Sequence, residues 1–205
     1  KYSYTFKDDG GTDTFDLSGY NGTAGVTIDL NQAIDASYNW LDKKTIVGDE
    51  YVYITRGTNI ENAIGTSKDD TIYGNGSANE LTGGLGDDTL TGGTNFDRFI
   101  INTGDGTDTI TDPEYYDRII FNGVSVSGVA IRVGNGLYQL GDFFLQQENL
   151  DLFITLDATT SVILKNFFPA TYDGTTTFSN TGITYPITGT SGNDLLGGSS
   201  VYEVI

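Results

Sequence analysis

The sequence predicts an all-β fold, in which short parallel strands form a right-handed solenoid and antiparallel β-hairpins cover its end. Two observations predict this fold. Residues 65–100 divide into four blocks of nine with one pattern, GTSKDDTIY, GNGSANELT, GGLGDDTLT and GGTNFDRFI, and a fixed short period is typical of a solenoid. Residues 129–164 instead alternate apolar and polar residues, as strands of a sheet with one buried face do.

Strand and turn signals also precede the blocks. Residues 2–6, YSYTF, alternate like an edge strand. The sequence DDGGTDTFDLSGY at 8–20 adds a further turn of glycines and acids. We expect this segment to cap the start of the solenoid.

Within each block, small residues come first, an acid or amide is sixth and an apolar residue is eighth. Glycines permit the positive φ angles of a tight turn and leave backbone carbonyls facing one point. The sixth side chain points at the same place, and the triplet after it forms a short strand with its apolar residue turned inward. Two blocks would make one coil, so residues eighteen apart stack, which places Asp70 over Asp88 and Asn79 over Asp97.

Oxygen atoms arranged in this way suit a hard cation. Carbonyls and several carboxylates are ligands that Ca²⁺ prefers, whereas Mg²⁺ requires near-octahedral geometry and keeps its waters. The alternative is that Gly, Asp and Asn only form the turns of an ordinary β-solenoid. Two facts weigh against it: the acid keeps one fixed position, and a row of carboxylates without ions would repel itself. We therefore expect several bound Ca²⁺ ions.

The period slips by two residues after the fourth block and resumes in residues 103–120, TGDGTDTIT and DPEYYDRII. Across this slip Asp88 is expected to meet Asp108, and Asp97 is expected to meet Asp117. The second pairing is the weaker one, because PEYY replaces the glycines that a tight cage needs.

From residue 121 the pattern changes to hairpins. VAIRV and LYQL flank the tight-turn sequence GNG at 134–136, and LDLFITL and SVILKNFF flank DATT at 157–160. These strands would cover the open end of the solenoid, which otherwise exposes unpaired backbone and apolar side chains. A Thr- and Tyr-rich loop follows, and GTSGNDLLG at 189–197 restarts the nine-residue pattern with Asp194.

We accordingly divide the chain into three parts. Residues 1–120 form the solenoid with its N-terminal cap, residues 121–187 form the antiparallel segment with its loop, and residues 188–205 form a further coil. That coil could return to the main solenoid or open a second one. Because Lys1 does not begin a signal peptide, we expect the chain to be a monomeric module of a larger protein.

The composition excludes several classes of function. Asp and Glu outnumber Lys and Arg 28 to 10, for a net charge of −18, which argues against binding to nucleic acid or to anionic membranes. No apolar run reaches the length of a membrane span. Cysteine and histidine are absent, so disulfides, zinc sites built from those residues, histidine bases and cysteine nucleophiles are excluded. The charge also predicts a metal-free chain that repels itself, with calcium supplying folding free energy.

Particular motifs resemble known families. GGLGDDTLT at 83–91 matches in full the nonapeptide GGxGxDxUx of calcium-binding RTX (haemolysin-type) proteins, and the blocks resemble their β-roll. DDGGTDTFDLSGY, GVTIDL at 25–30 and NIENAIGTSKDDTIYGN at 59–75 make residues 3–100 resemble the C-terminal domain of serralysin-type secreted metalloproteases. Residues 118–168, with strands that lead to KNFF, are loosely similar to modules of large RTX exoproteins and adhesins.

The serralysin resemblance implies two further calcium ions near the N-terminus, one held by Asp8, Gly10 and Asp13 and one by Gly11, Asp13 and Glu61. In that family the first of these sites also draws on residues upstream of the segment corresponding to this chain. The full set of expected calcium ligands comprises Asp8, Gly10, Gly11, Asp13, Glu61, Gly65, Asp70, Gly74, Gly76, Asn79, Gly83, Leu85, Gly86, Asp88, Gly92, Thr94, Asp97, Asp108, Asp117 and Asp194.

Three functions remain open from the sequence. The chain could be a noncatalytic module of a large secreted RTX protein such as an adhesin, the C-terminal secretion and folding domain of a serralysin-like protease, or a spacer without a ligand. Catalysis by paired carboxylates is less favoured, because metal ligation already accounts for the acids in the glycine turns. The protease motif HExxH requires histidine, which this chain lacks.

We favour the first function, because the hairpins, the loop and the restarted repeat exceed what secretion and folding require. Calcium with an unfilled coordination position could accept an oxygen of a peptide terminus or a glycan. Tyr115, Tyr116, Tyr172 and Tyr185 are candidate contact residues, although covering the sheet would explain them as well. The family resemblance implies an extracellular or cell-surface location and export by a type I system of a Gram-negative bacterium.

Overall fold

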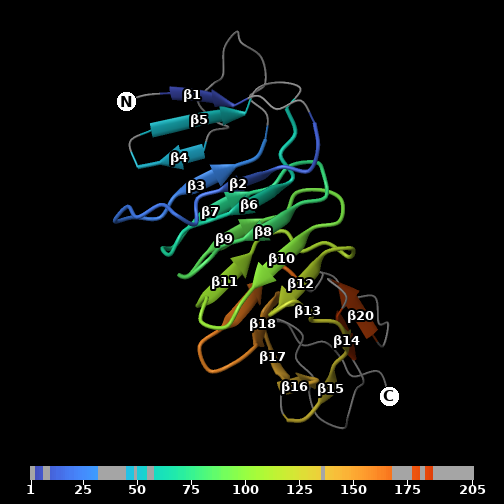
Figure 1. The fold of residues 1–205 in the computed structure, drawn as a ribbon. Helices are drawn as coiled ribbons and strands as arrows, with labels where there is room; N and C mark the ends of the chain where they lie inside the picture. The colour runs from blue at the N-terminus through green and yellow to red at the C-terminus, as the bar shows by residue number, and fades with distance from the viewer. Residues whose placement is uncertain are drawn as a thin grey trace.

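The computed structural model describes residues 3–6, 10–31, 45–48, 50–54, 58–134, 137–167, 177–180 and 183–186. Every regular element in these residues is a β-strand, which confirms the predicted all-β class. Figure 1 shows the strands stacked in a column, from the blue N-terminal strands to the yellow and orange hairpins. Within the described residues there is no helix long and apolar enough to cross a membrane.

Two sheets of largely parallel strands build the column, and a third, small sheet lies beside the hairpins. In spatial order, the smaller roll sheet contains β13 (Val124–Ser125), β12 (Arg118–Phe121), β10 (Arg98–Ile101), β8 (Glu80–Thr82), β6 (Asn62–Ile64) and β2 (Thr14–Asp16). The larger sheet contains β1 (Ser3–Phe6), β5 (Glu50–Ile54), β4 (Thr45–Val47), β3 (Thr27–Asp29), β7 (Thr71–Tyr73), β9 (Thr89–Thr91), β11 (Thr107–Ile110), β19 (Ser161–Leu164), β18 (Asp151–Thr155), β17 (Phe143–Glu148), β16 (Leu137–Leu140) and β15 (Ile131–Arg132). The third contains β14 (Gly128–Val129), β21 (Ile183–Pro186) and β20 (Thr177–Asn180).

The strand register confirms the predicted stacking. Ile72 pairs with Leu90 between the parallel strands β7 and β9, a separation of eighteen residues. Beyond the slip, Leu90 pairs with Ile110, a separation of twenty. The eighth-position residues are all fully buried: Ile72, Leu81, Leu90, Phe99, Ile110 and Ile119. Each such side chain contributes about 1.5–3 kcal/mol by its burial, so every half-coil adds one unit of apolar core.

Antiparallel strands close the N-terminal end of the larger sheet. β4 runs antiparallel to its neighbours β3 and β5, and β1 pairs in parallel with β5 at the sheet edge. The edge strand expected at residues 2–6 is therefore confirmed.

The hairpin segment closes the other end of the larger sheet. β19 pairs in parallel with β11, where a further coil would otherwise lie. The antiparallel pairs β15–β16 and β18–β19 confirm both predicted hairpins. Val162 and Leu164 of β19 are fully buried and extend the apolar column. The domain boundaries stay predictions, and residues 188–205 lie outside the described residues.

Candidate metal centre

Two rows of buried polar side chains run along the roll, one beside each sheet. We call Asp70, Asp88 and Asp108 the first row, and Asn79, Asp97 and Asp117 the second row. All six residues are at most 2% exposed. Each directly precedes a strand or lies at its start, because the glycine turn ends there and the inward-facing triplet begins.

In the first row each carboxylate accepts a hydrogen bond from the backbone of the coil before it. Val26 N donates to Asp70 Oδ1 (2.7 Å), Asp70 N donates to Asp88 Oδ1 (2.7 Å) and Asp88 N donates to Asp108 Oδ1 (3.1 Å). The predicted contacts of Asp70 with Asp88 and of Asp88 with Asp108 are therefore present. These bonds fix the position of the carboxylates but use only one oxygen of Asp88 and leave its charge uncompensated.

The second row repeats this arrangement with an amide at its start. Asn79 N donates to Asp97 Oδ1 (2.8 Å), and Asp97 N donates to Asp117 Oδ1 (3.0 Å). Asn79 Nδ2 donates to the Glu61 carbonyl (2.8 Å), a bond that an aspartate could not make. The second row therefore carries one charge fewer than the first.

Two buried oxygens at the middle of the rows support a cation site. Asp88 Oδ2 and Asp97 Oδ2 are buried and accept no hydrogen bond from any described residue. A buried carboxylate oxygen without a partner costs several kcal/mol or more. A Cβ at Gly83 would lie 2.0 Å from Asp88 Oδ2, and a Cβ at Gly92 would lie 2.4 Å from Asp97 Oδ2. Only glycine leaves room beside these oxygens.

Backbone carbonyls lie beside the first member of each row, because the glycine positions that they approach are also close to Asp70 Oδ2 and Asn79 Oδ1. A Cβ at Gly65 would lie 2.2 Å from the Gly83 carbonyl oxygen, and a Cβ at Gly74 would lie 2.2 Å from that of Gly92. Among the described residues, no three acidic side chains converge on one point. An ion would therefore take part of its coordination from carbonyls, which suits the mixed oxygen shell of Ca²⁺.

Burial and crowding change the acidity of the rows. Burial, with a smaller contribution from the nearby carboxylates of Asp108 and Asp70, raises the pKa of Asp88 to about 8 despite the lowering effect of the hydrogen bond from Asp70 N. Burial likewise raises the pKa of Asp108 to about 7, that of Asp97 to about 7 and that of Asp117 to about 6. Such groups favour protons or a cation over the bare charged state.

The N-terminal turn brings together three of the residues implied by the serralysin resemblance. Asp13 N donates to Glu61 Oε2 (2.9 Å), and Glu61 N donates to the Asp13 carbonyl (3.2 Å). Asn59 Nδ2 also donates to Glu61 Oε1. Gly11 lies beside Asp13, and its φ of 141° is a value that favours glycine. Their role as calcium ligands stays a prediction.

The other expected residues fall into two groups. Gly10, Gly76, Leu85, Gly86 and Thr94 lie in turns of the roll, and Leu85 is exposed. Asp8, Tyr172 and Asp194 lie outside the described residues, as does the side chain of Tyr185 in β21. Calcium ligation by the first group and by Asp8 and Asp194 remains a prediction, as does contact of Tyr172 and Tyr185 with an extracellular ligand.

Sequence reasoning missed two acids beside the rows. Asp105 is 5% exposed, and its Oδ2 accepts from Asn102 N (2.6 Å). Asp112 accepts from Gly92 N and Gly93 N, each at 2.9 Å. Both residues replace early turn positions of the slipped blocks, so aligning those blocks position by position could have revealed them.

Comparisons with known proteins agree with this geometry. Residues 58–99 match the family model described as the RTX calcium-binding nonapeptide repeat. An 81-residue segment is 43% identical to serralysins of Photorhabdus laumondii and Photorhabdus luminescens. That segment is 40% of this chain and 15% of each relative, so the chain matches only a small part of those proteins. The chain is thus a calcium-binding module of RTX nonapeptide repeats with distant similarity to the C-terminal region of serralysins.

Proposed function

We propose that the chain is a noncatalytic module of a large secreted bacterial RTX protein, an adhesin, which folds on calcium and binds an extracellular ligand. The observation that carries the proposal is the pair of buried rows with unpartnered oxygens at Asp88 and Asp97. In this proposal calcium makes the roll rigid, and the appended strands and surface side chains contact the ligand.

Calcium would couple folding to the environment. The chain carries a net charge of −18, and its rows concentrate part of that charge in the interior. Without ions, burial of these carboxylates opposes folding, whereas bound ions make folding favourable. A chain that stays unfolded at low cytoplasmic calcium and folds outside the cell suits export by a type I system.

The ligand would be a peptide terminus or a glycan that is bound while calcium is present. Tyr115 and Tyr116 are 59% and 51% exposed, and both lie in the turn that leads into Asp117. Exposed tyrosines supply flat amphipathic contact area at low entropic cost. Tyr172 and Tyr185 stay candidates from the sequence.

A second candidate function is supported by the 43% identity to serralysins. The chain would then be the secretion and folding domain of a zinc metalloprotease whose catalytic domain lies upstream. The full-length gene discriminates between the two, because a domain with HExxH directly upstream favours the protease and tandem extender repeats favour the adhesin.

The proposed ligand binding is tested by applying the calcium-loaded protein to glycan and peptide arrays, with a chelated sample in parallel. Binding that requires calcium is expected. A protein that is folded in calcium and binds nothing in either condition would contradict the adhesin proposal and favour a folding module or a spacer.

A further inference from the structure

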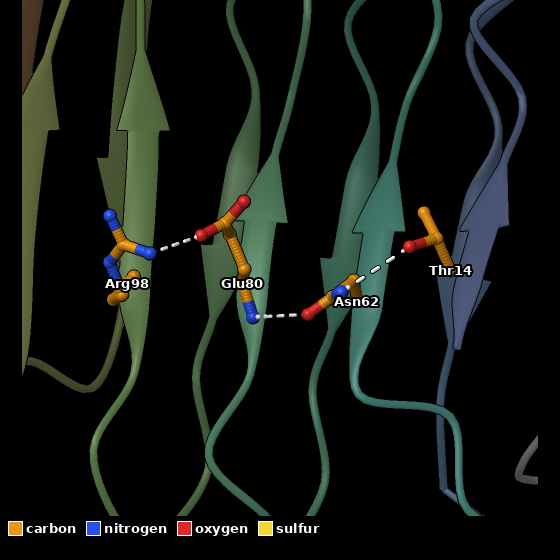
Figure 2. Close-up of polar contacts among 4 residues, drawn as sticks. All are labelled: Thr14, Asn62, Glu80 and Arg98. Carbon is orange, nitrogen blue, oxygen red and sulfur yellow. Dashed lines mark hydrogen bonds and ion pairs between the residues drawn. The ribbon is translucent and has the colours of Figure 1, made fainter. Parts of the chain in front are cut away.

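The outer face of the smaller sheet carries a row of polar side chains at one register, which Figure 2 shows across four strands. Thr14 accepts from Asn62 Nδ2 (3.3 Å), Asn62 Oδ1 accepts from Glu80 N (3.2 Å), and Glu80 Oε2 pairs with Arg98 Nη1 (2.5 Å). From Thr14 to Arg98, each residue of this row therefore forms a hydrogen bond or an ion pair with the next one.

The next register position breaks that pattern. Arg118 of β12 is the strand partner of Arg98 of β10, so two cations lie side by side. Like charges directly opposite each other destabilise a sheet. Arg118 Nη1 donates to the carbonyls of Tyr115 (3.2 Å) and Asp117 (2.6 Å), and no described acid forms an ion pair with it.

Three exposed aromatic rings lie at the same corner. Phe96, Tyr115 and Tyr116 are 58%, 59% and 51% exposed. The ring centroids of Phe96 and Tyr116 are 4.8 Å apart, and those of Tyr115 and Tyr116 are 5.0 Å apart. The hydrogen bond of Arg118 to the Tyr115 carbonyl holds its guanidinium against this turn. Clustered exposed rings are typical of a binding surface.

We propose that these five residues, Phe96, Arg98, Tyr115, Tyr116 and Arg118, form an aromatic–arginine platform that binds uronic acid residues of a carboxylated polysaccharide. This inference rests on the proposed ligand-binding function and specifies its ligand. The rings offer faces on which the C–H faces of pyranoses stack. The guanidinium groups offer planar donors that match a carboxylate, and Glu80 engages only one nitrogen of Arg98.

Features of the sheet favour a saccharide over a peptide. β10 is paired on both sides, by β8 and β12, and β12 is paired by β10 and β13. A peptide cannot add to β10 as a further strand, because β8 and β12 occupy both of its edges, and β13 already covers Ile120 and Phe121 of β12. Side-chain faces and the guanidinium groups of Arg98 and Arg118 remain for recognition, and these groups give the corner local donors for a carboxylate although the chain as a whole is acidic.

The test is isothermal titration calorimetry, in which a short oligogalacturonate is titrated into the calcium-loaded full chain. The protein is first dialysed to remove free calcium, because free calcium would itself bind the uronates. The parent is expected to bind, and added salt should weaken binding. The variants Arg98→Ala and Tyr116→Ala should each bind about tenfold more weakly or worse. Lys165→Ala, which removes a cation that pairs with Asp151 away from the platform, should leave binding unchanged.

Circular dichroism in calcium verifies that each variant is folded. Equal binding by parent and platform variants, or equal binding of an uncharged galactan of the same length, would overturn the assignment. Calcium-dependent binding of a peptide with a free carboxyl terminus, without binding of oligogalacturonate, would also overturn it while leaving the proposed function intact. If the folded protein showed no calcium-dependent binding to any arrayed ligand, that result would contradict both the platform and the proposed ligand-binding function.

Discussion

The two rows of the roll differ in charge and in the turns that enclose them. The first row has three aspartates, and glycine-containing turns directly precede both Asp88 and Asp108. The second row begins with Asn79 and ends at Asp117, behind a turn in which Pro113 and its neighbours replace glycine. One repeat therefore supplies two unequal rows of ligands, and the stability of the first row should depend more strongly on calcium.

The largest expected effect is the loss of the charge at the centre of the first row. Asp88→Asn keeps the shape and the bond from Asp70 N but removes a charged ligand, so the calcium-loaded protein should lose about 3–5 kcal/mol of unfolding free energy. Asp117→Asn, at the end of the second row, should cost about 1.5–3 kcal/mol. Urea unfolding in calcium measures both, and equal losses would contradict the inequality of the rows.

Closing the space beside Asp88 should have the next largest effect. Gly83→Ala would place a Cβ 2.0 Å from Asp88 Oδ2, which should cost about 3 kcal/mol, at the upper end of overpacking effects. Gly19→Ala serves as a control, because a Cβ there meets nothing within 4 Å. Thermal melts in calcium compare them, and a fully stable Gly83→Ala protein would argue against the glycine cage.

The stacking of the coils was predictable because the nine-residue period sets it directly. Counting also predicted the pairs across the slip, Asp88 with Asp108 and Asp97 with Asp117, because the strand register must keep the apolar residues inside. The cap was predicted as hairpins, but local patterns do not specify which roll strand they join. The pairing of β19 with β11 is set by long-range packing of apolar side chains such as Val162.

The repeating acids of the candidate site were predictable from the sequence in the same way, but its other acids were not. The sixth-position acids repeat at a fixed interval, so their burial in rows follows from the period. Asp105 and Asp112 do not repeat, and their burial depends on hydrogen bonds with Asn102 and with the backbone of the preceding coil. The cross-strand pair of Arg98 and Arg118 likewise depends on the two-residue slip, which moves the partner of Arg98 to a separation of twenty.

Asn79→Asp should make the second row resemble the first. The variant loses the donor to the Glu61 carbonyl and sets a carboxylate oxygen against it, so at limiting calcium the protein should lose about 1–2 kcal/mol of unfolding free energy. Bound calcium should offset that loss, because the second row gains a third carboxylate. Melting temperatures of parent and variant at limiting and at saturating calcium check this, and an equal difference in both conditions would contradict it.

The pH dependence of the metal-free protein should distinguish the rows by a smaller effect. Folding raises the pKa of Asp88 to about 8 and that of Asp97 to about 7, from an ordinary value of 3.8. The folded state therefore holds protons that the unfolded chain releases, and the resulting stability is complete below about pH 4 and is lost as pH rises toward 8. Over this range first-row amides should lose more hydrogen-exchange protection than second-row amides, because the pKa of Asp117 is raised only to about 6 and the loss that this residue contributes ends there. Rows that lose protection together, or stability that rises with pH, would contradict this expectation.

Hydrogen exchange at pH 7.5 with and without a calcium chelator tests most directly whether divalent ions hold the roll together. In calcium, the amides of Asp70, Asp88, Asn79 and Asp97, which all donate within the rows, should be strongly protected. In chelator they should exchange at rates close to those of an unfolded chain. Protection that is unchanged by the chelator would show that the acidic rows are stable without ions and would contradict folding on calcium.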